Sequence, residues 1–271
     1  MKLSKSMARV GTAMVLVLGG LASLTAATGT GTSAAAPRAA SAVGSNPVRV
    51  IEYGDSLSME AGNFFNFFLG PHATVVNRSY GGTSPCTWAA DMWQEAGNFV
   101  PQAVVIQFSG TAFSPCMAGY VPGTLGYYYK YAADTEAVIS LFNAVGARVY
   151  VAGYPVALSS PPWWNVLNQV YAAVAAQYPN AVFVNAGASV EANGHFTWTL
   201  PCAYFEPCNV PCKNQAVVPG SDCVRGPDGG HFCPDGNESF AGFLGTCDEW
   251  SSGAFRYGLA LASGPARDFG L

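Results

Sequence analysis

The chain has 271 residues, with 12 lysines and arginines against 16 aspartates and glutamates, and a formal net charge of −4. A chain with excess acidic residues is a poor partner for nucleic acid and for anionic membrane surfaces, which are themselves negatively charged. The length allows one sizeable core or at most two small domains.

The first 42 residues have the layout of a secretory signal peptide. Basic residues come first, an apolar segment from Ala13 to Leu24 follows, and a tract of small residues leads to Ala42. A spanning helix, the alternative, needs about 20 unbroken apolar residues, and Gly19 and Gly20 interrupt this segment. We therefore expect cleavage after Ala42, with a site near Ala35 as the alternative, and secretion of residues 43–271 as one domain, without stable membrane insertion. The segment has four basic and no acidic residues, so the remaining chain carries −8.

After the signal segment, short apolar and β-branched runs alternate with helix-length segments. The predicted strands are 48–53, 73–77, 103–108, 148–154 and 181–187. The predicted helices are 57–69, 87–98, 124–145, 163–178 and 249–263. Continuously apolar short strands are typical of sheets covered on both faces, and alternation with helices implies a parallel sheet. The sequence thus predicts an α/β fold.

The first predicted strand ends at a polar turn, Gly-Asp-Ser-Leu, that contains Ser56. In a parallel sheet, ligands gather beyond the carboxyl ends of the strands. The next helix is expected to begin at or just after Ser56, so its unpaired N–H groups and positive end face the same place. Ser56 is therefore either the N-cap of this helix or a nucleophile, and on its own the serine favours the cap.

A serine nucleophile needs a base that accepts its proton near neutral pH, and the chain has three histidines. His72 opens the second predicted strand, and His195 has only Glu191 nearby to orient it. His231 differs because Asp228 precedes it by three residues, across two glycines. Such a turn lets the Asp228 carboxylate hold the imidazole, as in a Ser-His-Asp triad; an ordinary Gly-Asp turn is the alternative.

The motif GDSL at Ser56 and the motif DGGH ending at His231 together resemble the SGNH (GDSL) hydrolase family. Each motif is short, but their order and their distances from the chain ends make the pair specific. The resemblance covers most of the chain after the signal segment. It implies a three-layer α/β/α sandwich with a flavodoxin-like sheet of five parallel strands. It also implies ester hydrolysis by a triad of Ser56, His231 and Asp228 that requires no metal or cofactor.

The same family uses a glycine after the second strand and an asparagine after the third as oxyanion donors. In VVNRSYGGTSP the best match is Gly82 and the alternative is Gly81, although Gly-Gly also suits any tight turn. In VVIQFSGTAF the asparagine position holds Thr111, and Ala112 stands where the family has aspartate. The resemblance therefore implies an oxyanion hole of Ser56 N–H, Gly82 N–H and, in part, the Thr111 hydroxyl.

The eight cysteines all follow the signal segment, and an even number in an exported chain favours disulfides. On the family's fold, Cys86 and Cys116 follow the two oxyanion loops closely, so we expect a disulfide between them. The other six allow fifteen pairings. Four of these six, with five prolines, fall in a cysteine-rich insertion at 188–230, which is expected to be held by disulfides. Zinc bound by the group from Cys202 to Cys233 with His231 is the alternative, but the spacing lacks the usual paired two-residue gaps.

Three classes of function follow from these residues. The favoured one is a secreted serine ester hydrolase that acts on a small-molecule or polymeric ester, either a lipid or an acetylated carbohydrate. An acyltransferase would use the same triad, and a binding module with lost turnover would account for Thr111 and Ala112. Aromatic residues such as Tyr127 to Tyr129, Trp163 and Trp198 could stack on sugars, although such residues more often pack in a core.

Overall fold

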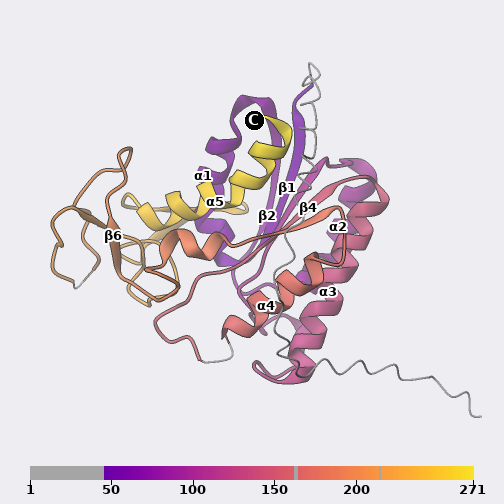
Figure 1. Ribbon diagram of the computed structural model, residues 1–271, viewed down its shortest axis with the longest axis horizontal. Helices are drawn as coiled ribbons and strands as arrows, with labels where there is room; N and C mark the ends of the chain where they lie inside the picture. Colours follow the sequence, from indigo (N-terminus) through magenta and orange to yellow (C-terminus); the bar gives the residue numbers. More distant parts are fainter. Residues whose placement is uncertain (1–45, 162–163, 214) are drawn as a thin grey trace, which may run out of the picture. The chain divides into compact units, whose positions relative to one another are not determined.

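A parallel five-stranded sheet is the centre of the structure, a computed structural model that describes residues 46–161, 164–213 and 215–271 (Figure 1). The predicted signal segment and its cleavage site lie outside these residues. The strands are β1 (Val48–Gly54), β2 (Ala73–Ser79), β3 (Ala103–Gln107), β4 (Arg148–Ala152) and β5 (Ala181–Val184). They are arranged in the order β2-β1-β3-β4-β5, and every neighbouring pair is parallel. The carboxyl ends of all five strands therefore lie along one edge of the sheet.

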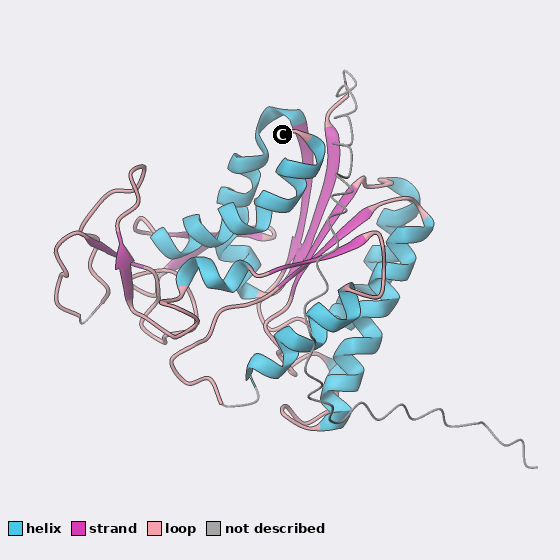
Figure 2. Cartoon of the chain, in the orientation of Figure 1, coloured by secondary structure: helices cyan, strands magenta, loops and turns pink. Residues whose placement is uncertain are grey.

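Helices cover both faces of the sheet and complete the three layers (Figure 2). One face carries α1 (Ser56–Leu69) and α5 (Ser252–Phe269), and the other carries α2 (Ala89–Asn98), α3 (Leu125–Ala144) and α4 (Trp164–Ala175). The central strand β3 is buried at every position because both of its faces are covered. The predicted α/β fold with a parallel sheet of five strands is confirmed.

The last helix continues beyond its predicted end. The predicted helix ends near residue 263, and a proline inside a helix removes a hydrogen bond and ordinarily ends it. In the structure, Pro265 lies inside α5. Asp268 ties the final turn to β4, because its carboxylate accepts a hydrogen bond from the Tyr150 hydroxyl (2.9 Å) and pairs with Arg148 at 2.6 Å. Tertiary contacts thus preserve a turn that local sequence signals would end.

The helices α1 and α5 approach each other closely at Gly258. A Cβ atom at this position would lie 2.8 Å from the Ala61 carbonyl oxygen and 2.9 Å from the Phe65 amide nitrogen. Gly258→Ala is therefore expected to lower the free energy of unfolding by about 1 to 3 kcal/mol, since the two backbones must separate. Gly126→Ala in α3 is the control, because a Cβ there has nothing within 4 Å. In urea unfolding, Gly258→Ala should lower the free energy of unfolding and Gly126→Ala should not. Equal stability of the two variants would contradict this packing.

The predicted insertion contains two disulfides and two short strands. Disulfides join Cys202 to Cys208 and Cys212 to Cys223, and β6 (Thr199–Pro201) pairs antiparallel with β7 (Ser221–Cys223). Arg225, fully buried, connects this region to the core by donating to the carbonyls of Val156 and Val190, both at 3.1 Å. Cysteine binds zinc as a thiolate, so the zinc alternative would require these bonds to be reduced.

A hairpin follows the histidine motif. It consists of β8 (Glu238–Ala241) and β9 (Leu244–Cys247), and it packs on α1. The fourth disulfide, Cys233 to Cys247, joins the hairpin to the loop that carries His231. No helix among the described residues is long and apolar enough to cross a membrane.

Candidate active site

The three residues of the predicted triad lie in hydrogen-bond contact, although Ser56 and His231 are 175 positions apart in the chain. His231 Nε2 is 2.8 Å from Ser56 Oγ, and His231 Nδ1 is 2.5 Å from Asp228 Oδ2. The other carboxylate oxygen of Asp228 accepts the backbone N–H groups of Gly230 (2.9 Å) and His231 (3.0 Å). The turn thus orients the carboxylate and the imidazole together, in the order that a triad requires.

Asp55, rather than Ser56, caps helix α1. Its carboxylate accepts the Leu57 N–H at 3.2 Å, and the helix begins at Ser56. The same carboxylate accepts the N–H and the hydroxyl of Ser109 at 2.5 and 2.6 Å, which connects the turn at Ser56 to the loop after β3. Asp55 is fully buried, and burial raises its pKa although the Ser109 bonds oppose this shift. Ser56 is therefore not needed as a cap, and its hydroxyl contacts His231 instead.

The sequence reasoning missed Asp55. Aspartate is as good an N-cap as serine, and the residue immediately precedes the expected start of the helix, so this preference could have identified it. His72 and His195, the other histidines considered as bases, form no hydrogen bond with Ser56 in the described residues. His195 instead forms an isolated β-bridge with Ala192.

The pKa of His231 is raised to about 9, chiefly because its imidazolium would donate to Asp228, while burial acts in the opposite direction. The same hydrogen bond holds the pKa of Asp228 well below its usual range. The Asp228 carboxylate is therefore ionised wherever the imidazole can act as a base. Because only a neutral imidazole accepts a proton, the fraction of His231 ready to do so grows as the pH rises towards 9.

The Gly81-Gly82 turn passes beside Ser56. A Cβ on Gly81 would lie 3.8 Å from Ser56 Cβ, and Gly82 has a φ of 76°, in the left-handed region that favours glycine. No acceptor within the described residues occupies the N–H of Ser56 or of Gly82. The Thr111 hydroxyl, however, donates its only proton to the Thr83 carbonyl at 2.7 Å. Two of the three expected oxyanion donors are thus available, and the third is directed elsewhere.

Buried tyrosines hold the loop that contains Thr111. Three tyrosine hydroxyls donate to successive parts of its backbone, and burial raises the pKa of each, so they stay protonated donors. The pairs are Tyr127 with Gly110, Tyr131 with Thr111 and Tyr171 with Phe108, at 2.5, 2.6 and 2.9 Å. Tyr127 is therefore a core residue rather than a surface for sugars, whereas Tyr129 is exposed. Trp163 lies outside the described residues.

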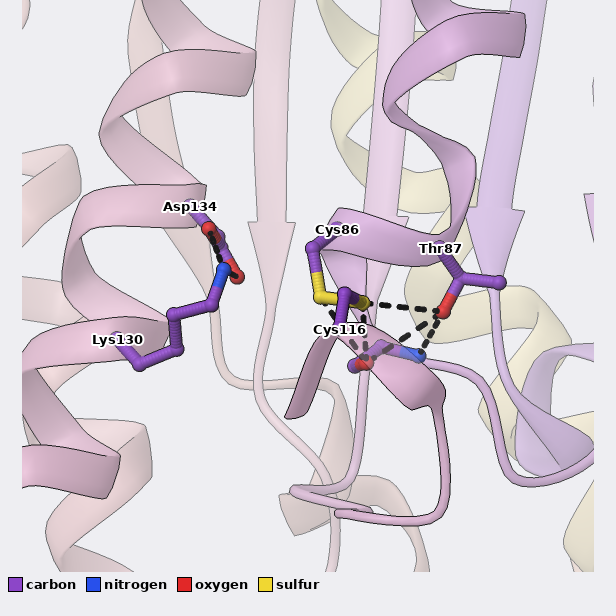
Figure 3. Close-up of polar contacts among 6 residues, drawn as sticks. Cys86, Thr87, Cys116, Lys130 and Asp134 are labelled. Atoms are coloured by element: carbon purple, nitrogen blue, oxygen red, sulfur yellow. Dashed lines mark hydrogen bonds and ion pairs between the residues drawn. A yellow bond between two sulfur atoms is a disulfide. The ribbon is translucent and has the colours of Figure 1, made fainter. Parts of the chain in front are cut away.

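A disulfide between Cys86 and Cys116 joins the two loops beside Ser56 (Figure 3). Its Cα atoms are 6.2 Å apart, within the range of about 4.4 to 6.8 Å usual for such bonds. The Thr87 and Ser114 hydroxyls, 2.7 Å apart, add a second link between the same segments. The loops after β2 and β3 are therefore bound to each other as well as to the sheet.

No protein-family profile and no curated protein matches the sequence, but 55 chains of solved structures match the fold. A candidate SGNH hydrolase from Slackia heliotrinireducens is 15% identical and covers 80% of this chain and 98% of its own, with a TM-score of 0.51. A candidate arylesterase from Agrobacterium tumefaciens is 16% identical, covers 82% and 99%, and has a TM-score of 0.49. A catalytic mutant of an acetylxylan esterase from Geobacillus stearothermophilus is 14% identical, covers 53% and 78%, and has a TM-score of 0.43.

Sequence identities this low support a conclusion about the fold only. That conclusion rests on the structure from Slackia heliotrinireducens. It extends over most of this chain, whose sheet has the order β2-β1-β3-β4-β5 and helices on both faces. The chain therefore has the fold of the SGNH hydrolases.

Proposed function

We propose that the protein is a serine ester hydrolase in which Ser56 attacks the carbonyl carbon of an acyl ester. The observation that carries this proposal is the chain of hydrogen bonds from Ser56 through His231 to Asp228, at 2.8 and 2.5 Å. A capping or packing role for Ser56 would not require a base at its hydroxyl, nor a carboxylate at the far nitrogen of that base.

Each residue of the site has one task in the reaction. As the Ser56 oxygen bonds to the carbonyl carbon, His231 Nε2 takes the hydroxyl proton and Asp228 stabilises the imidazolium. The N–H groups of Ser56 and Gly82 stabilise the tetrahedral oxyanion. The ester C–O bond then breaks, and the alcohol leaves with the proton from His231. Water attacks the acyl-serine with His231 again as base, which releases the carboxylic acid and restores Ser56.

The cellular setting proposed is extracellular or in the cell envelope. All eight cysteines are paired in disulfides, and such bonds persist in oxidising compartments. Together with the signal segment predicted at residues 1–42, this supports secretion. The proposed substrate is a lipid ester or an acetylated carbohydrate. Aryl esters from acetate to palmitate, assayed beside acetylated xylan, would separate these two classes.

A fluorophosphonate probe tests the proposal directly, because it reacts with an activated serine and mimics the tetrahedral intermediate. We expect one phosphonyl group per chain, mapped to Ser56 by peptide sequencing, and much slower labelling of the His231→Gln variant. A protein that is not labelled, or a Ser56→Ala variant labelled as fast as the parent, would refute the proposal. Acyl transfer to an added alcohol in preference to water would favour the acyltransferase alternative.

The hydrogen bond from Thr111 to Thr83 is the one observation that favours a site with weak turnover. Asparagine at position 111 could donate to Thr83 and to the oxyanion, since its amide has two N–H groups. Thr111→Asn is therefore expected to raise kcat on a short-chain aryl ester by about tenfold or more. Thr111→Val, the shape-matched control, should change kcat by less than about threefold, whereas a loss near 100-fold would show that the hydroxyl stabilises the transition state.

A further inference from the structure

Glu60 lies on the same face of α1 as Ser56, one helical turn further along. It is only 4% exposed, and its Oε2 atom accepts the backbone N–H of Phe232 at 2.6 Å. Phe232 directly follows His231. One helix thus contacts the histidine loop at two successive residues: Ser56 meets the imidazole, and Glu60 meets the next peptide group.

The hairpin β8–β9 lies beside Glu60, whose carboxylate is within 4.8 Å of the Glu238 carboxylate. Asn63 of α1 anchors the hairpin, because its amide donates to the Gly245 carbonyl at 3.2 Å and contacts the Thr246 hydroxyl at 2.8 Å. The Cys233 to Cys247 disulfide joins the same hairpin to the histidine loop. Helix α1, the hairpin and the histidine loop are therefore each linked to one another, and these links constrain the contact of Glu60 with Phe232.

A pocket of about 320 Å³ lies beside these groups and is lined by Glu60, Asp228, His231 and Glu238, among others. Lys213 also lines it, but its Nζ atom donates to the Asp235 backbone carbonyl at 2.8 Å. No ion pair of Glu60 with lysine or arginine occurs within the described residues. The imidazole of His231 is thus the cationic group that acts most strongly on Glu60.

The titration of Glu60 and that of His231 are coupled. Burial raises the pKa of Glu60 to about 8, an effect that Glu238 and Asp228 increase and His231 opposes. In return, Glu60, Asp228 and Asp55 each raise the pKa of His231. The negative charge of Glu60 therefore favours the protonated imidazole, which is the form that cannot act as a base.

We propose that Glu60 is a positioning residue of the active site: its carboxylate holds the peptide after His231 on the helix that carries Ser56, and its charge acts on the imidazole of His231. This inference rests on the proposed ester hydrolysis. It assigns to one carboxyl group the placement of the base and, beside the larger effect of Asp228, a part in the pH dependence of activity. Glu60 does not touch the reacting atoms.

Two substitutions separate these two roles. Glu60→Gln keeps an oxygen that accepts the Phe232 N–H but removes the charge. We expect kcat at high pH to stay within about threefold of the parent, and the acidic limb of kcat/KM to move down by about one pH unit. Glu60→Leu removes the acceptor as well, and should lower kcat by about tenfold or more with little change in KM, because the imidazole is displaced.

A proton NMR titration of the His231 ring provides a readout that does not depend on turnover. The chain has three histidines, so the His231 resonance can be followed in the resting protein. It should titrate at lower pH in Glu60→Gln than in the parent. Glu238→Gln is the control for charge alone, because Glu238 also lines the pocket but does not bond to Phe232. Glu238→Gln should leave kcat at high pH unchanged, and it should shift the acidic limb of kcat/KM by less than Glu60→Gln does.

The inference is overturned if Glu60→Gln moves neither the acidic limb nor the NMR titration, including the case in which it only lowers the melting temperature. It is also overturned if Glu60→Leu retains the parental kcat. Failure of the proposed function looks different, since Ser56→Ala would then hydrolyse esters as fast as the parent. The NMR titration would still report whether Glu60 acts on His231.

Discussion

Ser56→Ala is expected to lower kcat for an aryl ester by about ten thousand-fold to a million-fold, because no acyl-serine forms without the hydroxyl. The residual rate would come from substrate binding and the two backbone N–H groups. Ser263→Ala on the exposed face of α5 is the matched control, since that hydroxyl bonds only to the Ala260 carbonyl of its own helix. Its kcat should stay within about twofold of the parent, as for most surface substitutions.

The double variant Ser56→Ala/His231→Gln sharpens this test. Residues that act as one unit have non-additive effects, so the double variant should be no slower than Ser56→Ala alone. If the two losses multiplied, Ser56 and His231 would act independently, and the proton transfer inferred from their 2.8 Å contact would be wrong.

Asp228→Asn is expected to lower kcat by about ten thousand-fold while leaving the fold intact. The remaining oxygen of asparagine can still accept the N–H groups of Gly230 and His231, so the turn should persist. The amide no longer stabilises the imidazolium, and it favours the tautomer with the proton on the nitrogen that faces Ser56. Asp235→Asn in the same loop, whose carboxylate bonds to Asn237, is the control and should leave kcat unchanged.

The pH profile of Asp228→Asn carries a second expectation. The Asp228 carboxylate is the largest cause of the raised pKa of His231, which is about 9 in the parent. Without it, the imidazole loses its proton at lower pH, so the small remaining activity should begin at lower pH. A parent profile with its acidic limb near the ordinary histidine value of about 6.5 would contradict this electrostatic picture.

The main elements of the fold were predictable because their signals are local. β3 is apolar and buried from Ala103 to Ile106, and β4 is buried from Val149 to Ala152, and both strands lie where the sequence indicates. The four short strands β6 to β9 were not predicted, since each has three or four residues and disulfides such as Cys212 to Cys223 hold the surrounding loops. Pairing among six cysteines depends on distances that no local pattern encodes.

The site was predictable in part for a related reason. Ser56, His231 and Asp228 lie in short motifs, whereas the role of Glu60 depends on a partner 172 positions away. A glutamate in the first turns of a helix ordinarily indicates a solvated position, whereas this one is only 4% exposed, with Cys233 and Glu238 close to its carboxylate. The bond from Thr111 to Thr83 is likewise invisible in the sequence, because a hydroxyl has several acceptors within reach.

The packing of α1 against α5 has a consequence for biosynthesis. The N-terminal half of the chain holds Ser56, but His231, Asp228 and Ser251 all come from the last fifth. Ser251 is the N-cap of α5, and its hydroxyl donates to the Phe232 carbonyl at 2.7 Å. A nascent chain that has not yet reached this part has no His231 to contact Ser56. Under the proposed function, ester hydrolysis would therefore begin only after the segment with Asp228 and His231 has been translated and has docked beside Ser56.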